Sequence, residues 1–179
     1  MIDHSGEVLI LTGPPGSGKT TTAAALAALP GAPKVHLHAD DFWHVIKAGA
    51  IPPYEAAAHR QNAVVIDALA GAAAIYARGG YFVVLDGIVG PWFLAPFRAL
   101  SVPVHYVVLR PPLDIAISRC QARGGDTLTA PEPITALHRQ FAALDELERH
   151  VVATGTASRE ETLAAVLAAL AGGAFRLAA

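Results

Sequence analysis

The ten residues LTGPPGSGKT, at positions 11–20, constrain the fold more than any other part of the sequence. Glycine costs backbone entropy and proline removes a hydrogen-bond donor, so three glycines and two prolines within ten residues require a geometric reason. An apolar run precedes them and an alanine-rich run follows. Residues 13–20 match G-x-x-x-x-G-K-[ST] at every fixed position, which is the pattern of a phosphate-binding loop between a strand and a helix.

The residue types of this loop predict its chemistry. Glycines let the backbone curl until consecutive N–H groups point at phosphate oxygens, and the following helix directs its positive end to the same place. Lys19 reaches the β- and γ-phosphates of a nucleotide, and the Thr20 hydroxyl is a ligand for Mg²⁺. We therefore expect ATP and Mg²⁺ as cofactors. The nucleotide-binding residues predicted here are Gly13, Pro14, Pro15, Gly16, Ser17, Gly18, Lys19, Thr20 and Thr21.

The phosphate-binding motif does not name a reaction, because motors, switches, ATPases and small-molecule kinases all carry it. A glycine-rich turn without a ligand is the alternative interpretation. It is disfavoured because the motif and its strand–helix context occur together.

Along the rest of the chain, short apolar runs alternate with longer helical patterns. Strands are predicted at 7–13, 34–40, 81–87, 102–110 and 150–155, and helices at 19–29, 54–80, 112–125, 134–148 and 158–170, with a short helix or irregular segment at 91–100. Ser158 and Glu161 have the spacing of a capping box. This alternation predicts an α/β fold of three layers, a five-stranded parallel sheet with helices on both faces. With 179 residues and no repeat or linker, one domain covering 1–179 is expected.

Acidic residues follow two of the predicted strands, at the edge where open parallel sheets bind ligands. Asp40 is our candidate for the carboxylate that orients an acceptor hydroxyl and takes its proton, and Asp41 could instead cap the next helix. Asp86 ends the third strand and is typical of the acid that holds Mg²⁺ through water or positions a substrate. Turn formation or capping is the alternative for all three, and the division of roles among them stays open.

Two arginines lie four residues apart on one helix face, Arg119 and Arg123, and glycines 124–125 end that helix. Because a guanidinium makes multidentate contacts with phosphate, we predict that both arginines act on the transferred group from a lid-like segment near 119–131. The alternative is a solvated helix face with Asp126 as a salt-bridge partner. Arg159, after the last strand, is a candidate for stacking on the adenine ring, or belongs to a plain loop.

Other residues give weaker signals. Residues 59–62, with Trp43, His44 and Tyr54, are candidates for the lining of an acceptor pocket. His36 and His38 alternate along a strand and are interpreted as structural. Cys120 is interpreted as a small buried residue rather than a nucleophile.

Composition excludes several classes of function. A formal net charge of −2 argues against a protein that binds nucleic acid or a membrane surface by bulk charge. A single cysteine rules out an intrachain disulfide and favours a reducing cytoplasm. The acidic N-terminal segment is unlike a secretory signal, and no unbroken apolar stretch is long enough for a transmembrane helix. We expect a cytoplasmic monomer or homodimer with a small-molecule substrate and no nucleic-acid or membrane partner.

Taken in order, the motifs GPPGSGKT, HADDFW, VVLDG and LRPPLDIAISRCQARGGD resemble those of the P-loop small-molecule kinases. The resemblance is to gluconate kinases and chloramphenicol phosphotransferase-like proteins, which also carry the description of AAA-type ATP-binding proteins, and it covers nearly the whole chain. It implies that Asp40 contacts the acceptor hydroxyl, that Asp86 is the acid of the third strand, and that Arg119 and Arg123 belong to a lid helix.

The sequence departs from two neighbouring classes of kinase. Relatives that resemble polynucleotide kinases carry an arginine shortly after the strand-end acid, whereas Phe42, Trp43 and His44 stand here. Cytidylate and adenylate kinases carry a longer, arginine-rich monophosphate site that this sequence lacks. The aromatic pair Phe42-Trp43 suggests a partly apolar acceptor.

The predicted function is the ATP-dependent transfer of the γ-phosphate to a hydroxyl of a small molecule. Two alternatives remain: a nucleotide-binding ATPase switch without a small-molecule acceptor, and a nucleoside monophosphate kinase of the cytidylate type.

Overall fold

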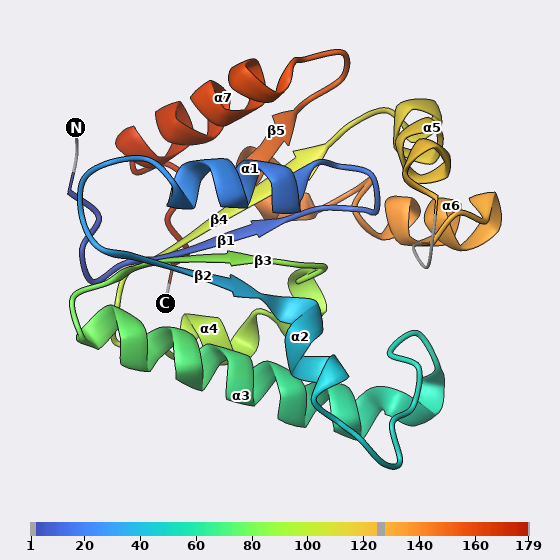
Figure 1. Ribbon diagram of the computed structural model, residues 1–179, viewed down its shortest axis with the longest axis horizontal. Helices are drawn as coiled ribbons and strands as arrows, with labels where there is room; N and C mark the ends of the chain where they lie inside the picture. Colours follow the sequence, from blue (N-terminus) through green and yellow to red (C-terminus); the bar gives the residue numbers. More distant parts are fainter. Residues whose placement is uncertain (1–2, 125–127, 179) are drawn as a thin grey trace.

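The computed structural model describes residues 3–124 and 128–178. Its centre is a sheet of five strands in the order β2-β3-β1-β4-β5, all of them parallel (Figure 1). The strands are β1 (Val8–Thr12), β2 (Lys34–His38), β3 (Phe82–Asp86), β4 (Val104–Arg110) and β5 (Val151–Ala153). Because the strands are parallel, their carboxyl ends meet at one edge, toward which the arrows in Figure 1 point. The predicted α/β fold is confirmed.

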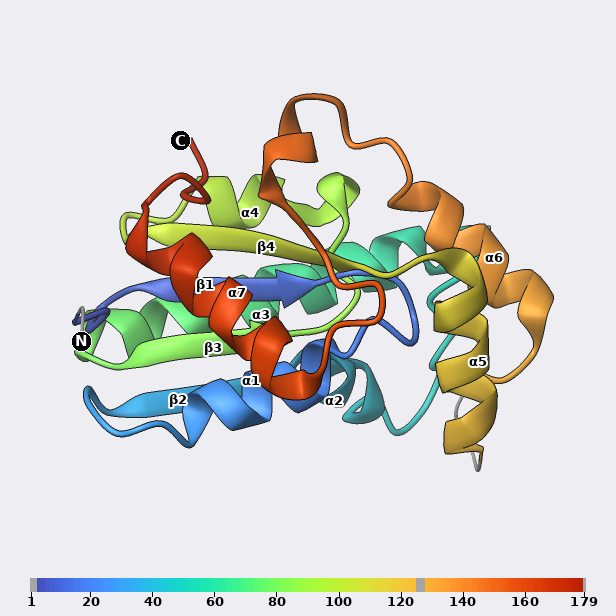
Figure 2. The same ribbon diagram turned by 90° about the horizontal axis from the view of Figure 1, so that it is seen from above.

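Helices cover both faces of this sheet (Figure 1). One face carries α1 (Lys19–Ala27) and α7 (Arg159–Ala171), and the other carries α3 (His59–Arg78) and α4 (Ala95–Arg98). Beyond the carboxyl ends of the strands stand α2 (Ala39–His44), α5 (Leu113–Arg123) and α6 (Pro131–Gln140), as Figure 2 shows from above. Short 3-10 segments occur at Ala56–Ala58, Pro91–Phe93 and Asp145–His150.

Successive side chains of each strand point to opposite faces of the sheet, so the core is divided into two layers, one on each face. Val8 and Ile10 of β1 pack with Leu69 and its neighbours on α3, whereas Leu9 and Leu11 pack with Leu26 of α1 and with α7. All four β1 side chains are fully buried, because a sheet covered on both faces leaves no polar face. This rigid centre fixes the carboxyl-end edge on which the functional residues lie.

The single helix predicted over 134–148 is wrong in its second half, because α6 ends at Gln140 and a separate 3-10 turn begins at Asp145. Arg110, at the end of β4, explains the break: its guanidinium donates to the Phe141 carbonyl at 2.8 Å and pairs with Glu148. The chain turns with Asp145 at a φ of +49°, in the left-handed region. The side chains of residues 141, 144 and 147 are all buried, so apolar residues keep a helix-like spacing across this turn. That spacing is the reason why the sequence predicted one continuous helix.

Two other predicted boundaries differ. The helix predicted from residue 54 begins at His59, after the 3-10 turn at Ala56–Ala58. The second strand ends at His38 rather than at residue 40, so Asp40 and Asp41 lie in the first turn of α2. The capping box at Ser158 and Glu161 is confirmed by both of its hydrogen bonds. No helix in the described ranges is long and apolar enough to cross a membrane.

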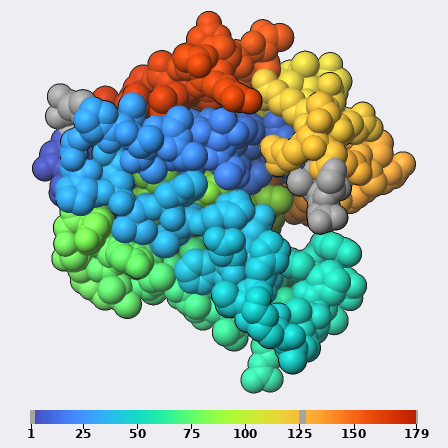
Figure 3. Space-filling model, viewed as in Figure 1, coloured from blue at the N-terminus to red at the C-terminus, as the bar shows by residue number. Residues whose placement is uncertain are grey.

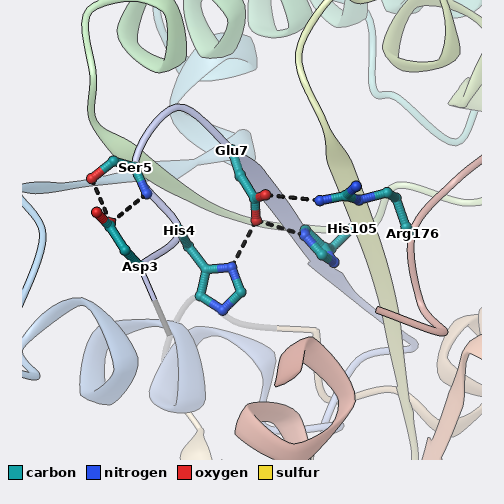
Figure 4. A network of polar contacts seen from close by, with 6 residues as sticks. All are labelled: Asp3, His4, Ser5, Glu7, His105 and Arg176. Carbon is teal, nitrogen blue, oxygen red and sulfur yellow. Dashed lines mark hydrogen bonds and ion pairs between the residues drawn. The ribbon is translucent and has the colours of Figure 1, made fainter. Parts of the chain in front are cut away.

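A polar network ties the chain together at the edge of the sheet opposite the phosphate-binding loop (Figure 4). The carboxylate of Glu7 accepts from His4 Nδ1 at 2.7 Å, from His105 Nε2 at 2.9 Å and from Arg176 Nη2 at 2.8 Å. These partners come from the N-terminal segment, from β4 and from the C-terminal segment. Both carboxylate oxygens are therefore occupied, and Glu7 joins the N-terminal segment to two distant parts of the chain.

This network makes stability depend on pH. Burial lowers the pKa of His105, whose Nδ1 is buried without a hydrogen-bond partner among the described residues. Burial alone would raise the pKa of Glu7, but hydrogen bonds from His4 and His105 hold it below its ordinary value. Both shifts mean that the unfolded chain binds protons more readily than the folded one. The free energy of unfolding should therefore fall as the pH drops toward and below 6.5, the pKa at which an ordinary histidine is half protonated.

Replacing His105 with glutamine should make that acid dependence shallower. An amide still donates to Glu7 but does not titrate, so the variant loses the proton uptake that accompanies unfolding of the wild-type chain. His150, whose pKa is also lowered by burial, keeps part of the slope. Urea unfolding at a series of pH values from neutral downward measures the effect. A variant as steeply acid-sensitive as the wild type would contradict it.

Candidate active site

The phosphate-binding loop lies tightly against two neighbouring elements. Gly13 has a φ of +143°, and a Cβ there would stand 2.1 Å from the Leu109 carbonyl oxygen. Gly16 has a φ of +75°, and its Cβ would stand 2.3 Å from the carbonyl oxygen of Ala116 on α5. Only glycine satisfies both constraints, since any side chain would collide with backbone. The loop therefore keeps its curled path between β4 and α5.

The concave side of this loop offers donors for an anion. Helix α1 begins directly after Gly18, a residue that has no side chain to cap the helix. The first N–H groups of a helix have no intrahelical partner, so here they remain available to an anion. The Ser17 hydroxyl is buried and has no partner within the described chain. These features fit a nucleotide phosphate, which would accept from the free N–H groups and from the hydroxyl.

Three charged side chains, those of Asp40, Asp86 and Arg123, act on the partly buried residue Lys19. Burial lowers the pKa of this lysine, the negative charges of Asp40 and Asp86 raise it, and the positive charge of Arg123 lowers it again. The Nζ atom itself donates to the Pro14 carbonyl at 3.4 Å. The structure thus brings together the predicted lysine, both strand-end acids and one predicted arginine.

Asp86 is a fully buried carboxylate with three side-chain donors. The Thr20 hydroxyl donates to it at 2.5 Å, His36 Nε2 at 2.7 Å and His38 Nδ1 at 3.1 Å. Thr20 and Asp86, the predicted metal ligands, are therefore adjacent. Their oxygens are the donor type that Mg²⁺ prefers, so these residues fit the ion and would hold it.

His36 and His38 contribute more than the structural role that we predicted for them. In the pairing of β2 with β3, His38 lies opposite Asp86 and His36 lies two residues earlier, so both rings reach the same carboxylate. Their hydrogen bonds fix the orientation of Asp86. The alternation along the strand was visible in the sequence, but it did not reveal which strand lies next to β2.

Asp40 stands on the solvent side of this group. Its side chain is 57% exposed, and its Oδ2 lies 3.6 Å from His38 Nε2, so His38 connects the two predicted acids. Neither Asp40 nor Asp41 caps α2, because the N-cap position is His38, which makes no side-chain capping bond. The capping role considered for Asp41 is therefore wrong.

A first cavity of about 520 Å³ opens beside the phosphate-binding loop. Its lining comes from the loop and α1, from α5, and from the start of α7: Gly16, Ser17, Gly18, Thr21, Thr22, Arg119, Ala122, Arg123, Ala157, Ser158, Arg159 and Thr162. The three predicted arginines thus gather in one cavity, and Arg119 also donates to the Gly155 carbonyl at 3.3 Å. Residues 125–127 of the predicted lid, with Asp126, lie outside the described residues, and the movement of this segment stays a prediction.

A second and larger cavity, of about 1,620 Å³, lies on the other side of Asp40. Figure 3 shows the molecule hollowed between the segment around residues 50–60 and the α5–α6 pair. The side chains predicted for an acceptor pocket line it, namely Trp43, His44, Tyr54, His59, Gln61 and Asn62, but Arg60 is not among them. Trp92 and Phe93 also line it and were not predicted, since their segment gave no clear periodicity.

Comparison of the sequence with models of protein families gives a match: the model of a family described as an AAA domain matches residues 8–150. The chain belongs to this AAA domain family. The match spans the phosphate-binding loop, both strand-end acids and α5, and the family predicted from the motifs is confirmed. No curated protein matches the sequence.

Solved structures share the fold of this AAA domain protein. A gluconokinase from Sinorhizobium meliloti 1021 has a TM-score of 0.65 at 21% identity, covering 96% of this chain and 95% of its own. A shikimate kinase from Acinetobacter baumannii, in complex with shikimate, has a TM-score of 0.65 at 19% identity, covering 96% of each chain. A chain of the Pnkp1/Rnl/Hen1 RNA repair complex has a TM-score of 0.56 at 20% identity, covering 78% of this chain but only 45% of that one. The predicted P-loop fold is confirmed.

Proposed function

We propose that this protein transfers the γ-phosphoryl group of ATP to a hydroxyl group of a small molecule. One observation carries the proposal: Asp40 lines the larger cavity and is also close enough to Lys19 for its negative charge to oppose part of the lowering of the lysine pKa by burial. A hydroxyl in that cavity would meet a carboxylate beside the lysine that holds the terminal phosphates. Kinase chemistry is mostly such positioning together with electrostatic stabilisation.

Each residue has a defined task in this mechanism. The loop amides and Lys19 hold the phosphates, and Asp40 orients the acceptor hydroxyl and accepts its proton. Arg119 and Arg123 stabilise the charge on the transferred group, while Arg159 packs against the base in the smaller cavity. Thr20 and Asp86 would hold Mg²⁺, which when bound neutralises charge on the phosphates. His36 and His38 keep the Asp86 carboxylate in place.

An ATP-depletion assay against a panel of alcohols tests the proposal. The panel includes gluconate and shikimate, because a gluconokinase and a shikimate kinase share the fold, together with neutral and cationic alcohols. We expect ADP release that depends on an added alcohol and a product heavier by one phosphoryl group in mass spectrometry. GTP in place of ATP tests base preference.

Two outcomes would support other functions. ATP hydrolysis that responds only to a protein or a nucleic acid would favour the ATPase switch. Transfer to CMP, UMP or AMP, but to no alcohol, would favour a nucleoside monophosphate kinase.

A further inference from the structure

The charges of the larger cavity differ from those of the smaller one. Arg119, Arg123 and Arg159 all line the nucleotide side, whereas no lysine or arginine is among the described residues that line the larger cavity. Its charged side chains are the acidic Asp40 and Glu55. The residues outside the described ranges are Met, Ile, Gly, Asp, Thr and Ala, so they add no lysine or arginine either. The basic groups of the described lining are the imidazoles of His44 and His59, which the formal charge counts as neutral. A carboxylate or phosphate in this cavity would therefore lose water and meet two acidic groups with no lysine or arginine to compensate.

Apolar and aromatic side chains dominate the same lining. They include Trp43, Tyr54, Ile88, Trp92, Phe93, Leu128 and Leu137. Tyr54 and Trp92 are 84% and 48% exposed, so large apolar surface faces the open space. Trp92 is held in place by two neighbours. Its ring lies so close to Gly90 that a Cβ there would stand 2.2 Å from it, and the centres of the Trp92 and Phe141 rings are 5.8 Å apart. A fixed aromatic wall of this kind suits a flat or apolar molecule.

Two of the three amide side chains in the lining, those of Asn62 and Gln61, already have partners, and the third, Gln140, lies at the end of α6. Asn62 accepts from the Trp43 indole N–H at 2.8 Å and donates to the Pro53 carbonyl at 2.8 Å. Gln61 accepts from the Ile51 N–H at 2.8 Å and donates to the Ile51 carbonyl at 2.7 Å. These amides therefore position Trp43 and the segment around 51–53. Recognition of hydroxyl or amine groups is left to other polar side chains, among them Asp40 and Glu55.

We propose that the acceptor is an uncharged or cationic alcohol with an aromatic or apolar body, and that sugar acids and nucleotides are excluded by charge. This inference rests on the proposed function, because it describes the acceptor of that reaction.

Binding can be measured without any turnover, because the two tryptophans of the sequence, Trp43 and Trp92, both line this cavity. Their fluorescence therefore reports its occupancy directly. The probes are three molecules of one shape: 4-(hydroxymethyl)benzamide, 4-(hydroxymethyl)benzylamine and 4-(hydroxymethyl)benzoate. We expect the amide and the amine to quench with a Kd about tenfold lower than that of the benzoate. A benzoate that binds as well as the other two, or no quenching by any probe, would overturn the proposal.

Two surface variants sharpen the test by changing one charge each. Gln140→Lys adds a cation to the lining, and a lysine is also favourable at the C-terminal end of α6. It should tighten benzoate binding and leave the amide unchanged. Glu55→Gln removes a negative charge and should weaken only the amine. If Gln140→Lys does not tighten benzoate binding and Glu55→Gln does not weaken amine binding, charge does not select the acceptor and the inference fails.

The same probes with ATP separate this inference from the proposed function. Binding of the amide without its phosphorylation supports the acceptor class and contradicts the kinase reaction. Preferred phosphorylation of the benzoate supports the kinase reaction and contradicts the acceptor class.

Discussion

The variant Lys19→Ala is expected to transfer phosphoryl groups about 10²–10³-fold more slowly than the wild type. Burial lowers the pKa of Lys19, and the negative charges of Asp40 and Asp86 oppose part of that lowering, so both acids act on this cation. Without it, the phosphate oxygens would meet two carboxylates and lose the compensating positive charge. The loss should appear in kcat/KM, measured by ADP release with a saturating acceptor.

The variant should remain folded, which makes the comparison direct. Residue 19 is the first residue of α1, and alanine is the strongest helix former, so the backbone has no reason to change. Lys34→Ala is the matched control, since Lys34 lies at the opposite end of the sheet and, within the described part of the chain, donates to the Leu29 and Ala32 carbonyls. Turnover of Lys19→Ala close to that of this control would refute the phosphate-holding role.

The sequence was sufficient to predict the fold because each of its signals was local. The strand-to-helix loop at residues 13–20 has a fixed spacing, and the buried strands are unbroken apolar runs such as 82–85. The capping box at Ser158 is a spacing of three residues, and both of its hydrogen bonds are formed. Where a long-range contact decided the local structure, the prediction failed. Arg110 ends α6 by binding the Phe141 carbonyl, a residue 31 positions away.

The same distinction applies to the candidate site. The approximate ends of the strands could be located from the sequence, and the carboxyl-end edge of a parallel sheet then brought Asp40, Asp86 and Lys19 together. The partners of Asp86 could not be assigned, since His36 and His38 reach it only because β2 lies next to β3. Trp92 was missed for a related reason: its irregular segment has no period, and its place depends on packing against Phe141.

Asp40→Asn should lower kcat by about 10²–10⁴-fold, while the KM for ATP changes little. Asparagine has the shape of aspartate, so the acceptor still fits, but its amide cannot take the proton of the attacking hydroxyl. The residue is 57% exposed and lies on the wall of the acceptor cavity, so the substitution leaves no buried charge unpaired. Steady-state kinetics with varied ATP and varied acceptor separate the two parameters.

The neighbouring residue provides the control that decides the assignment. Asp41 lies in the same first turn of α2 and is exposed, but it is not part of the cavity lining. Asp41→Asn removes the same charge from the same helix end, so any loss of helix stability should be alike in the two variants. Only Asp40→Asn should lose turnover, because only Asp40 stands between the cavity and Lys19. A loss confined to Asp41→Asn, or shared equally, would place the proton acceptor elsewhere and leave Asp40 with a positioning role at most.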